Sequence, residues 1–557
     1  MRRRWLGVSG RIILAFIIGH LLATHAIASI SPAEREALIA LYNSTDGDHW
    51  SDNSGWKDQD GFAESGTENT WHGITTDEEN TKVLSVSLSS NNLVGSIPSA
   101  LGNLINLTSL SLRSNQLSGS IPSELGNLIN LTSLFLHQNQ LSGSIPSELG
   151  DLTNLTTLYL YNNQLSGSIP STLGKLKNLI ALPMAFNQLS GSIPPELGDL
   201  TNLEWLDLSR NQLSDSIPPE LGSLIKLAEL TLKDCQLSEA IPSELGDLTS
   251  LTYLDLSGNQ LSGSIPPDLG DLANLTRLYL YSNQLSDSIP PTLGNLTNLS
   301  RLYLFDNQLS DSIPPELGDL TNLTHLYLYN NQLSGTIPPE LSDLTNLQEL
   351  FLGSNQLTGE IPTEIMEMSS LSSLYFDWNA LHTDDETLLV FINSRNPGWE
   401  ETQTLAPENV TIGSIFATSV VIQWTPVTNT TYSGGYMISY STTPGGPYTL
   451  FDTTVDKSST QMEVTGLDSG KTYYFVVQTH TDPNEKNQSM VESDYSQEIA
   501  ATTINEDSDL VDAIIILQLL AQVRPSSIVL KQTDVNGDNK IGIEEVIYIL
   551  QKISELR

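Results

Sequence analysis

The sequence has very little cysteine and few basic residues. Cys235 is the one cysteine among 557 residues, so no disulfide can form within the chain. Lys and Arg number 24 against 65 Asp and Glu, which gives a formal net charge of −41. Nucleic acids and anionic membranes are bound by clustered Lys and Arg, so this composition argues against both as partners. Stability must come from the apolar core, and the single thiol raises the question of whether it reacts.

Long apolar runs are also scarce, and the chain has one at its N-terminus. Arg2, Arg3 and Arg4 are followed by an apolar stretch at 12–23 and by Ala-Ile-Ala at 26–28. This is the layout of a secretory signal peptide cleaved after residue 28. The alternative is a retained membrane anchor, although the stretch is short for a span of ~20 residues. We predict residues 1–28 to be a signal peptide, and the mature protein to be secreted or cell-surface associated without a transmembrane segment.

What the sequence has in abundance is one repeated frame of 24 residues. Steps of 24 from Asn91 to Asn379 pass through 13 positions, and Asn occupies all of them except position 235. Residues 107–128, LTSLSLRSNQLSGSIPSELGNL, show the frame. The LxxLxL pattern places alternate leucines of a short strand inward, and the Asn amide can satisfy backbone groups where the chain turns. One turn cannot bury its leucines alone, so stacked turns must share a continuous core.

This frame resembles the leucine-rich repeat family, in the form NxLsGxIPxxLGxL best known from plant receptors. The resemblance covers residues 83–380, about 13 repeats of 24 residues. It implies an α/β right-handed solenoid with a parallel β-sheet on its concave face.

The segments on either side of the repeats resemble caps. Residues 29–82 are similar to the N-terminal cap of that subtype but lack its usual cysteine pair, so we expect Trp50, Trp56 and Trp71 to cover the first turn. Residues 381–405 break the period, and we predict them to form a closing helix, a C-terminal cap and a linker.

Two columns of the predicted concave face are rich in aromatic side chains. Alternate positions of each strand should point to solvent there. The candidate ligand-binding residues are Arg277, Tyr279, Tyr281, Arg301, Tyr303, Phe305, His325, Tyr327, Tyr329, Phe351 and Tyr375. An exposed aromatic patch with an arginine rim is typical of a surface that binds a protein or peptide, and flat rings would equally suit a glycan. The alternative is that these cross-strand pairs only stabilise the sheet, by ~0.2–1 kcal/mol each.

Residues 406–503 have short alternating strands without the 24-residue period, as in a β-sandwich. Trp424 and the GLDSGKTYYF segment resemble a fibronectin type III domain, an all-β sandwich in which Tyr473 would tie its strand to the preceding loop. GLDSGKT has three residues between its glycines where a phosphate-binding loop needs four. We therefore expect this module to space or present the others and to carry no chemistry.

The last module, residues 504–557, contains the clearest predicted metal site. The segment DVNGDNKIGIEE at 534–545 has oxygen ligands at the spacing of an EF-hand calcium loop. The predicted Ca²⁺ ligand positions are Asp534, Asn536, Asp538, Lys540 through its carbonyl, Gly542 through a water, and Glu545. The alternative is an acidic turn that binds no metal.

A degenerate copy of this unit precedes it. Residues 512–520 align with 545–553, and the corresponding first loop, 501–512, has Ala501 and Thr503 where ligands are needed. We therefore predict one bound Ca²⁺. Paired loop–helix units resemble a dockerin domain, a small all-α module, which implies a cohesin-like partner. The departure in the first loop leaves open whether that partner is bound.

Catalytic patterns are missing from the sequence. The six histidines outside the predicted signal peptide are scattered, and there is no HExxH, CxxC or G-x-S-x-G motif. Asp207 and Asp255 should face the groove two turns apart, at roughly 10 Å. That spacing is within the range of an inverting glycosidase pair, but the surface is open. Cys235 stands at an Asn position where the repeat family admits Cys, so we expect it to be buried and unreactive.

Together these features predict a non-enzymatic recognition protein. It would bind a protein or glycan ligand on the concave face and dock through its calcium-dependent C-terminal module. The alternative is an accessory, dockerin-bearing subunit of an extracellular polysaccharide-degrading assembly.

Overall fold

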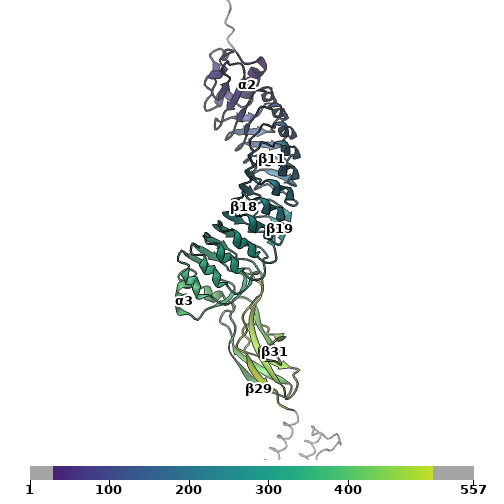
Figure 1. Ribbon diagram of the computed structural model, residues 1–557, viewed down its shortest axis with the longest axis vertical. Helices are drawn as coiled ribbons and strands as arrows, with labels where there is room; N and C mark the ends of the chain where they lie inside the picture. The colour runs from purple at the N-terminus through teal and green to yellow at the C-terminus, as the bar shows by residue number, and fades with distance from the viewer. Residues whose placement is uncertain (1–28, 506–557) are drawn as a thin grey trace, which may run out of the picture.

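The computed structural model describes residues 29–505. The predicted signal peptide and the predicted calcium loop lie outside the described residues. Figure 1 shows a long, curved solenoid with a β-sandwich at its C-terminal end. No helix within residues 29–505 has both the length and the apolar character needed to cross a membrane.

The N-terminal cap is built on helix α2 (Pro32–Ser44). Its first turn is closed by a capping box, in which the Ser31 side chain accepts from the Glu34 backbone N–H and the Glu34 carboxylate accepts from the Ser31 N–H. Trp50, Trp56 and Trp71 are at most 6 % exposed and join the leucine core. The prediction that they cover the first turn is confirmed. A short hairpin of β1 (Lys57–Asp58) and β2 (Gly61–Phe62) lies beside them.

The inner face of the solenoid is one sheet of 14 strands. All neighbours in it are parallel except β3 and β4, which are antiparallel. The strands are β3 (Ile74–Thr76), β4 (Val83–Ser87), β6 (Ser109–Ser111), β8 (Ser133–Phe135), β10 (Thr157–Tyr159), β12 (Ala181–Pro183), β14 (Trp205–Asp207), β16 (Glu229–Thr231), β18 (Tyr253–Asp255), β20 (Arg277–Tyr279), β22 (Arg301–Tyr303), β23 (His325–Tyr327), β25 (Glu349–Phe351) and β27 (Ser373–Tyr375). Each repeat residue pairs with the residue 24 positions on, as Tyr279 does with Tyr303, so the sheet has no register shift along its repeats.

A second set of short parallel strands runs along the flank of the solenoid. They are β5 (Val94–Ser96), β7 (Gln116–Gly119), β9 (Gln140–Gly143), β11 (Gln164–Gly167), β13 (Gln188–Gly191), β15 (Gln212–Leu213), β17 (Ser238–Glu239), β19 (Gln260–Gly263), β21 (Gln284–Leu285), β24 (Ser334–Gly335), β26 (Gln356–Glu360) and β28 (Ala380–His382). The chain bends at Gly119, whose φ is +76°, a value that glycine adopts without steric cost.

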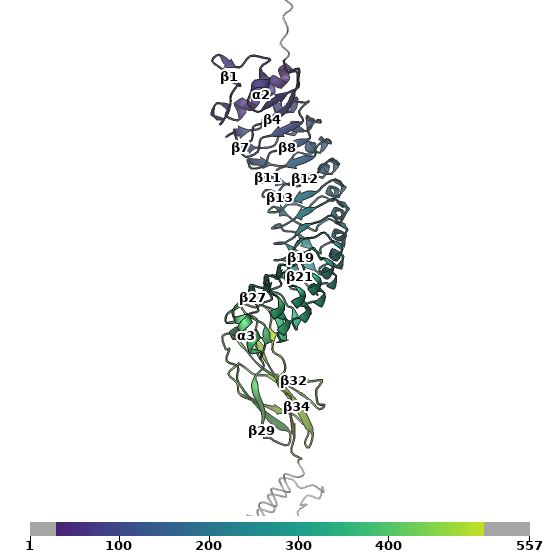
Figure 2. The same ribbon diagram turned by 60° about the vertical axis from the view of Figure 1, so that its left-hand side comes forward.

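The helical part of the predicted α/β solenoid is 3-10 helix, one five-residue segment per repeat. The segments are η3 (Ser99–Asn103), η4 (Ser123–Asn127), η5 (Ser147–Asp151), η6 (Ser171–Lys175), η7 (Pro195–Asp199), η8 (Pro219–Ser223), η9 (Ser243–Asp247), η10 (Pro267–Asp271), η11 (Pro291–Asn295), η12 (Pro315–Asp319), η13 (Pro339–Asp343) and η14 (Thr363–Glu367). Each follows a proline, whose fixed φ sets the direction of entry. Figure 2 shows these segments along the outer side of the curve.

Asparagines hold the turns together, as the sequence predicted. The Asn307 amide donates to the carbonyls of Leu304 in its own turn and Leu280 in the preceding one, both at 3.0 Å. Its Oδ1 accepts from the Leu285 N–H at 3.1 Å. The same pattern recurs along the solenoid and satisfies backbone groups that the bend would otherwise leave buried and unpaired. One continuous leucine core runs from Ile30 to Trp399.

The C-terminal cap consists of helix α3 (Glu386–Asn393) and the 3-10 segment η15 (Trp399–Thr402). Asp385 caps α3 by accepting from the N–H groups of Thr387 and Leu388. Trp399 is buried and closes the leucine core, as a closing helix and cap should.

The sandwich has its own core and two antiparallel sheets. Its strands are β29 (Glu408–Ile415), β30 (Ser419–Thr425), β31 (Gly434–Ser441), β32 (Thr449–Thr453), β33 (Gln461–Thr465), β34 (Thr472–Thr481), β35 (Val491–Glu492) and β36 (Ile499–Thr502). The Tyr473 hydroxyl accepts from the Asp468 N–H at 3.0 Å. The predicted tie between this strand and its preceding loop is therefore confirmed.

Candidate ligand-binding site

Seven of the predicted aromatic residues form two stacked columns on strands β20 to β25 and the residues that follow them. The first column consists of Tyr279, Tyr303, Tyr327 and Phe351, and the second of Tyr281, Phe305 and Tyr329. Successive centroids in the first column are 4.7, 4.3 and 4.6 Å apart, with interplanar angles of 15°, 4° and 8°. In the second they are 4.4 and 4.5 Å apart, at 9° and 11°. These separations follow from the strand spacing of ~4.8 Å, so each ring covers the face of the next.

Perpendicular rings close both ends of the first column and one end of the second. The other end of the second column is covered by the Lys233 ammonium, 5.2 Å from the centre of the Tyr281 ring. Tyr253 meets Tyr279 at 5.6 Å and 89°, and Tyr375 meets Phe351 at 6.2 Å and 82°. Tyr375 occupies this place because the preceding turn has Gly353, where a Cβ atom would overlap the Tyr375 ring. The rings therefore offer the ligand their edges and hydroxyl groups, while their faces are covered.

Charged groups touch the columns at their hydroxyl ends. Glu349 accepts a hydrogen bond from the Tyr327 hydroxyl, and its Oε1 lies 3.9 Å from His325 Nε2. Burial, and then this hydrogen bond, raises the pKa of Tyr327. Burial lowers the pKa of His325, which favours its neutral form. A hydrogen bond to the Tyr279 hydroxyl raises the pKa of Arg301, which stays a cation.

The structure brings all eleven predicted site residues together on one surface, but they are not equally accessible. Tyr279 is only 9 % exposed, because it lies between Tyr253 and Tyr303 at the end of its column. Arg277 is exposed, and its guanidinium lies 5.9 Å from the centre of the Tyr253 ring. The other nine are half-buried. Lys233, which follows strand β16 two turns earlier, donates to the Tyr281 hydroxyl at 2.6 Å and extends the polar rim.

A second aromatic cluster lies on earlier turns. His137 stacks on Tyr161 at 4.4 Å, and Trp205 meets Tyr159 edge-on at 5.7 Å. Sequence reasoning missed Trp205 because it stands in a different column of its strand. Burial lowers the pKa of His137 to about 4, so this histidine is neutral at pH 7.

The two carboxylates considered as a catalytic pair each fix the end of their own strand. Asp207 accepts from the backbone N–H and the hydroxyl of Ser209, at 3.0 and 2.6 Å. Asp255 is 3 % exposed and accepts from the Ser257 N–H at 3.0 Å and from the Tyr253 hydroxyl at 3.2 Å. Both carboxylates therefore serve the fold.

Cys235 lies inside the asparagine ladder, as predicted. It is 8 % exposed, and its thiol is 3.5 Å from the Leu208 carbonyl and 3.6 Å from that of Lys233. Burial raises the pKa of the Cys235 thiol to about 11. The reactive thiolate is therefore disfavoured at neutral pH.

The sandwich packs against the last turns of the solenoid, a contact that the sequence pattern does not predict. Asn487, in the loop 482–490 between β34 and β35, is 4 % exposed. Its amide donates to the Asn355 carbonyl at 2.8 Å and to the Trp378 carbonyl at 2.9 Å. The Trp378 ring also lies 5.1 Å from that of Tyr432. Figures 1 and 2 show the sandwich directly beyond the closing helix α3.

Two further contacts fasten this junction. The hydroxyls of Thr404 and Thr481 are 2.7 Å apart, and His382 Nε2 lies 3.5 Å from Asp494 Oδ2. No local pattern in the sequence could reveal these pairs, because the two modules share no period.

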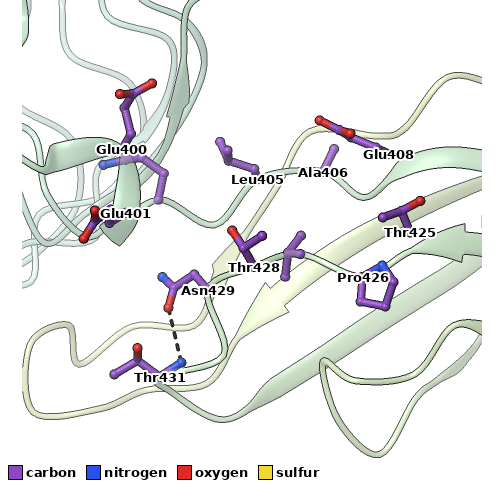
Figure 3. Close-up of a pocket in the computed structure, with 12 residues that line it drawn as sticks. Glu400, Glu401, Leu405, Ala406, Glu408, Thr425, Pro426, Thr428, Asn429 and Thr431 are labelled. Carbon is purple, nitrogen blue, oxygen red and sulfur yellow. Dashed lines mark hydrogen bonds between the residues drawn. The ribbon is translucent and has the colours of Figure 1, made fainter.

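The junction contains clefts on several sides. One of about 510 Å³, drawn in Figure 3, lies between the 400–408 segment and the 425–431 loop, where Asn429 Oδ1 accepts from the Thr431 N–H at 3.2 Å. Glu400 and Glu401 line it, but residues 29–505 contain no group of three or more metal-ligating side chains placed to hold an ion. Two other clefts, of about 570 and 610 Å³, adjoin the loop 482–490.

Comparisons with protein families agree with both modules. Residues 80–221 and 205–336 match the family described as Leucine-rich repeat region, and residues 321–363 match Leucine Rich repeats (2 copies). Residues 405–493 match the Fibronectin type III domain. No curated protein matches the chain.

Several solved structures are similar to the solenoid. A plant peptide hormone receptor, RGFR1 in complex with RGF2, is 37 % identical, with a TM-score of 0.56, covering 58 % of this chain and 55 % of its own. The PEPR1-AtPEP1 crystal structure is 32 % identical, with a TM-score of 0.58 and coverage of 68 % and 55 %. The Arabidopsis receptor kinase HAESA, in complex with the peptide hormone IDA and the co-receptor SERK1, is 37 % identical, with a TM-score of 0.55 and coverage of 63 % and 58 %. The chain thus spans somewhat more than half the length of each.

Proposed function

We propose that this chain, in which leucine-rich repeats are followed by a fibronectin type III domain, is a non-enzymatic extracellular recognition protein. Its ligand is a polypeptide that lies along the concave face over strands β20 to β27. The observation that carries this proposal is the pair of stacked aromatic columns.

The geometry of the columns favours a polypeptide over a glycan. Sugars bind aromatic residues mainly through the ring face, and these faces are covered by neighbouring rings. Ring edges, hydroxyl groups and an arginine remain, and these suit a chain with mixed apolar and polar groups. Two of the similar structures support this reading, since one is of a peptide hormone receptor and another contains a bound peptide hormone.

Binding to a displayed library of dodecapeptides, read out with the full chain, tests the proposal. Exchanging Tyr303 and Tyr327 together for Phe keeps the stack and removes two hydroxyls, and we expect the affinity of selected peptides to fall about 10-fold, as for two lost hydrogen bonds. The matched control exchanges Tyr159 and Tyr161 for Phe in the earlier cluster, and should change affinity less than twofold. If both variants bind the selected peptides with the wild-type affinity, the aromatic columns are not part of the binding site.

We also propose that the C-terminal module, residues 504–557, binds one Ca²⁺ and docks the protein to a partner. This rests on the sequence alone, because Asp534, Asn536, Asp538, Lys540, Gly542 and Glu545 lie outside the described residues. Calorimetric titration of the full chain should show one Ca²⁺ per chain, and Asp534→Ala should abolish the heat. The same Ca²⁺ titration curve in the variant and the wild type would refute the predicted calcium site.

The resemblance of the sequence of residues 504–557 to a dockerin suggests a second function, that of an accessory subunit in a polysaccharide-degrading assembly. Retention on an immobilised cohesin in Ca²⁺, and release by a chelator, would support it. A failure to bind would favour a free-standing recognition protein.

A further inference from the structure

The loop 482–490 of the sandwich is anchored to the solenoid by hydrogen bonds. Asn484 Oδ1 accepts from the N–H groups of Lys486 and Asn487, at 2.9 and 3.2 Å, and Asn487 Oδ1 accepts from the Ser489 N–H at 2.9 Å. The amide of Asn487 is meanwhile buried on two carbonyls of the solenoid. The backbone on either side of Asn487 is therefore anchored to the solenoid, and the exposed side chains of Glu485, Lys486 and Gln488 project from it.

A cleft of about 570 Å³ lies between this loop and the solenoid, within the usual size range of ligand sites. Glu485, Lys486 and Gln488 line it from the loop, and Asp306 and Tyr375 line it from the solenoid. Tyr375 is also the ring that closes the aromatic columns. The cleft therefore begins where the proposed peptide groove ends.

The second cleft, of about 610 Å³, continues the first around the loop. Gln332, Gln488 and Ser489 line both of them, so the two adjoin. A linear ligand leaving the concave face has a path past the loop between the two modules.

The acidic groups in the first cleft lack cationic partners. Asp306 accepts from the amide of Asn330 at 2.6 Å and from the hydroxyl of Ser282 at 3.4 Å, and both donors are neutral. Within residues 29–505, no Lys, Arg or His forms an ion pair with Asp306 or Glu485. The Lys486 ammonium on the same loop offsets only one of the two charges, and the chain as a whole is strongly acidic. A cleft of this kind attracts a cation.

We infer that the cleft between the loop 482–490 and the solenoid is a second part of the ligand site, and that it takes a lysine or arginine side chain of the bound polypeptide. Asp306 and Glu485 accept its hydrogen bonds, which are stronger when donor and acceptor are both charged. The fibronectin type III domain is then a component of the receptor surface. This inference rests on the proposed polypeptide-binding function.

The test compares charge-matched variants against peptides selected from the dodecapeptide library. Wild-type protein should enrich peptides with Lys or Arg at one preferred position. Exchanging Asp306 for Asn together with Glu485 for Gln should weaken these peptides at least 10-fold in 0.15 M salt. The control exchanges Glu220 for Gln and Asp247 for Asn on the outer face, which removes the same charge, and should change affinity less than twofold. Equal losses in both variants would mean that only net charge attracts the peptides, and would overturn the inference.

Further variants separate this inference from the proposed function. Asn487→Ala should release the loop and weaken the same peptides, with the solenoid still folded by circular dichroism. If the paired Tyr303 and Tyr327 exchange weakens binding and the Asp306 and Glu485 exchange does not, the concave face is the site and the cleft is refuted. If the cleft exchange alone weakens binding, the cleft stands and the aromatic columns are refuted. Selective binding to a glycan array that disappears in the cleft variant would overturn the assignment to a polypeptide.

Discussion

Replacing Cys235 with asparagine should stabilise the solenoid, because it restores the one gap in the asparagine ladder. The neighbouring turns show what is missing. Asn211 donates to two carbonyls at 3.1 and 2.9 Å and accepts from the Leu189 N–H at 3.0 Å, and Asn259 does the same at 2.9, 3.0 and 3.1 Å. The Cys235 thiol, a weak donor, reaches carbonyls only at 3.5 and 3.6 Å.

The size of the gain follows from this difference. An asparagine at position 235 is expected to add about two good hydrogen bonds, each worth ~0.5–1.5 kcal/mol net. Ordering the longer side chain removes part of that. We expect the free energy of unfolding to rise by about 1–2 kcal/mol.

Urea unfolding followed by circular dichroism measures this change. The reciprocal exchange, Asn259→Cys, places a thiol at the equivalent position of the next turn and should lower the free energy of unfolding by a similar amount. If Cys235→Asn lowers the stability or leaves it unchanged while Asn259→Cys is destabilising, the ladder argument fails at this turn, and packing around the thiol must dominate.

Three further predictions concern the site and the junction. Gly353→Ala should destabilise the protein by about 1–3 kcal/mol, because the added Cβ overlaps the Tyr375 ring. The loss of stability, measured by urea unfolding, should become smaller when Tyr375→Ala is added. A loss of the same size in the double variant would refute the clash. Asn487→Ala should loosen the two modules, so that limited proteolysis within 400–408 becomes faster, whereas an unchanged cleavage rate would show that the other contacts suffice. Burial lowers the pKa of Lys457 to about 8 in the folded protein, whereas a lysine in the unfolded chain has a pKa of ~10.4. Between these two pH values the unfolded chain binds more protons than the folded one. The free energy of unfolding should therefore rise with pH over this range, by about 3 kcal/mol in all. Lys457→Met should remove that rise relative to wild type in urea titrations from pH 7 to 10, and parallel curves would contradict the burial argument.

The surroundings of some residues depend on burial, which the sequence pattern does not specify. The sequence pattern places Asp207 and Asp255 on the groove face, but their hydrogen bonds to Ser209 and Ser257 show that they stabilise the ends of their strands. Each carboxylate accepts a hydrogen bond from a serine two residues further along the chain. Whether it bonds to that serine or to water depends on how deeply it is buried. Tyr279 was likewise placed in the correct column, and only the packed structure shows that its surface is almost entirely covered.

The sequence by itself determined the solenoid, its asparagine ladder and the membership of the aromatic columns. A strict 24-residue period leaves one way to stack the turns, so each residue must lie against its equivalent 24 positions away, as Tyr303 lies against Tyr327. The tertiary structure alone decided that ring faces are covered and edges exposed, and that the sandwich docks onto the last turns. Asn487 meets Asn355 across 132 residues of chain. No period relates these two residues, and the contact depends on the shapes of two surfaces that exist only after each module has folded.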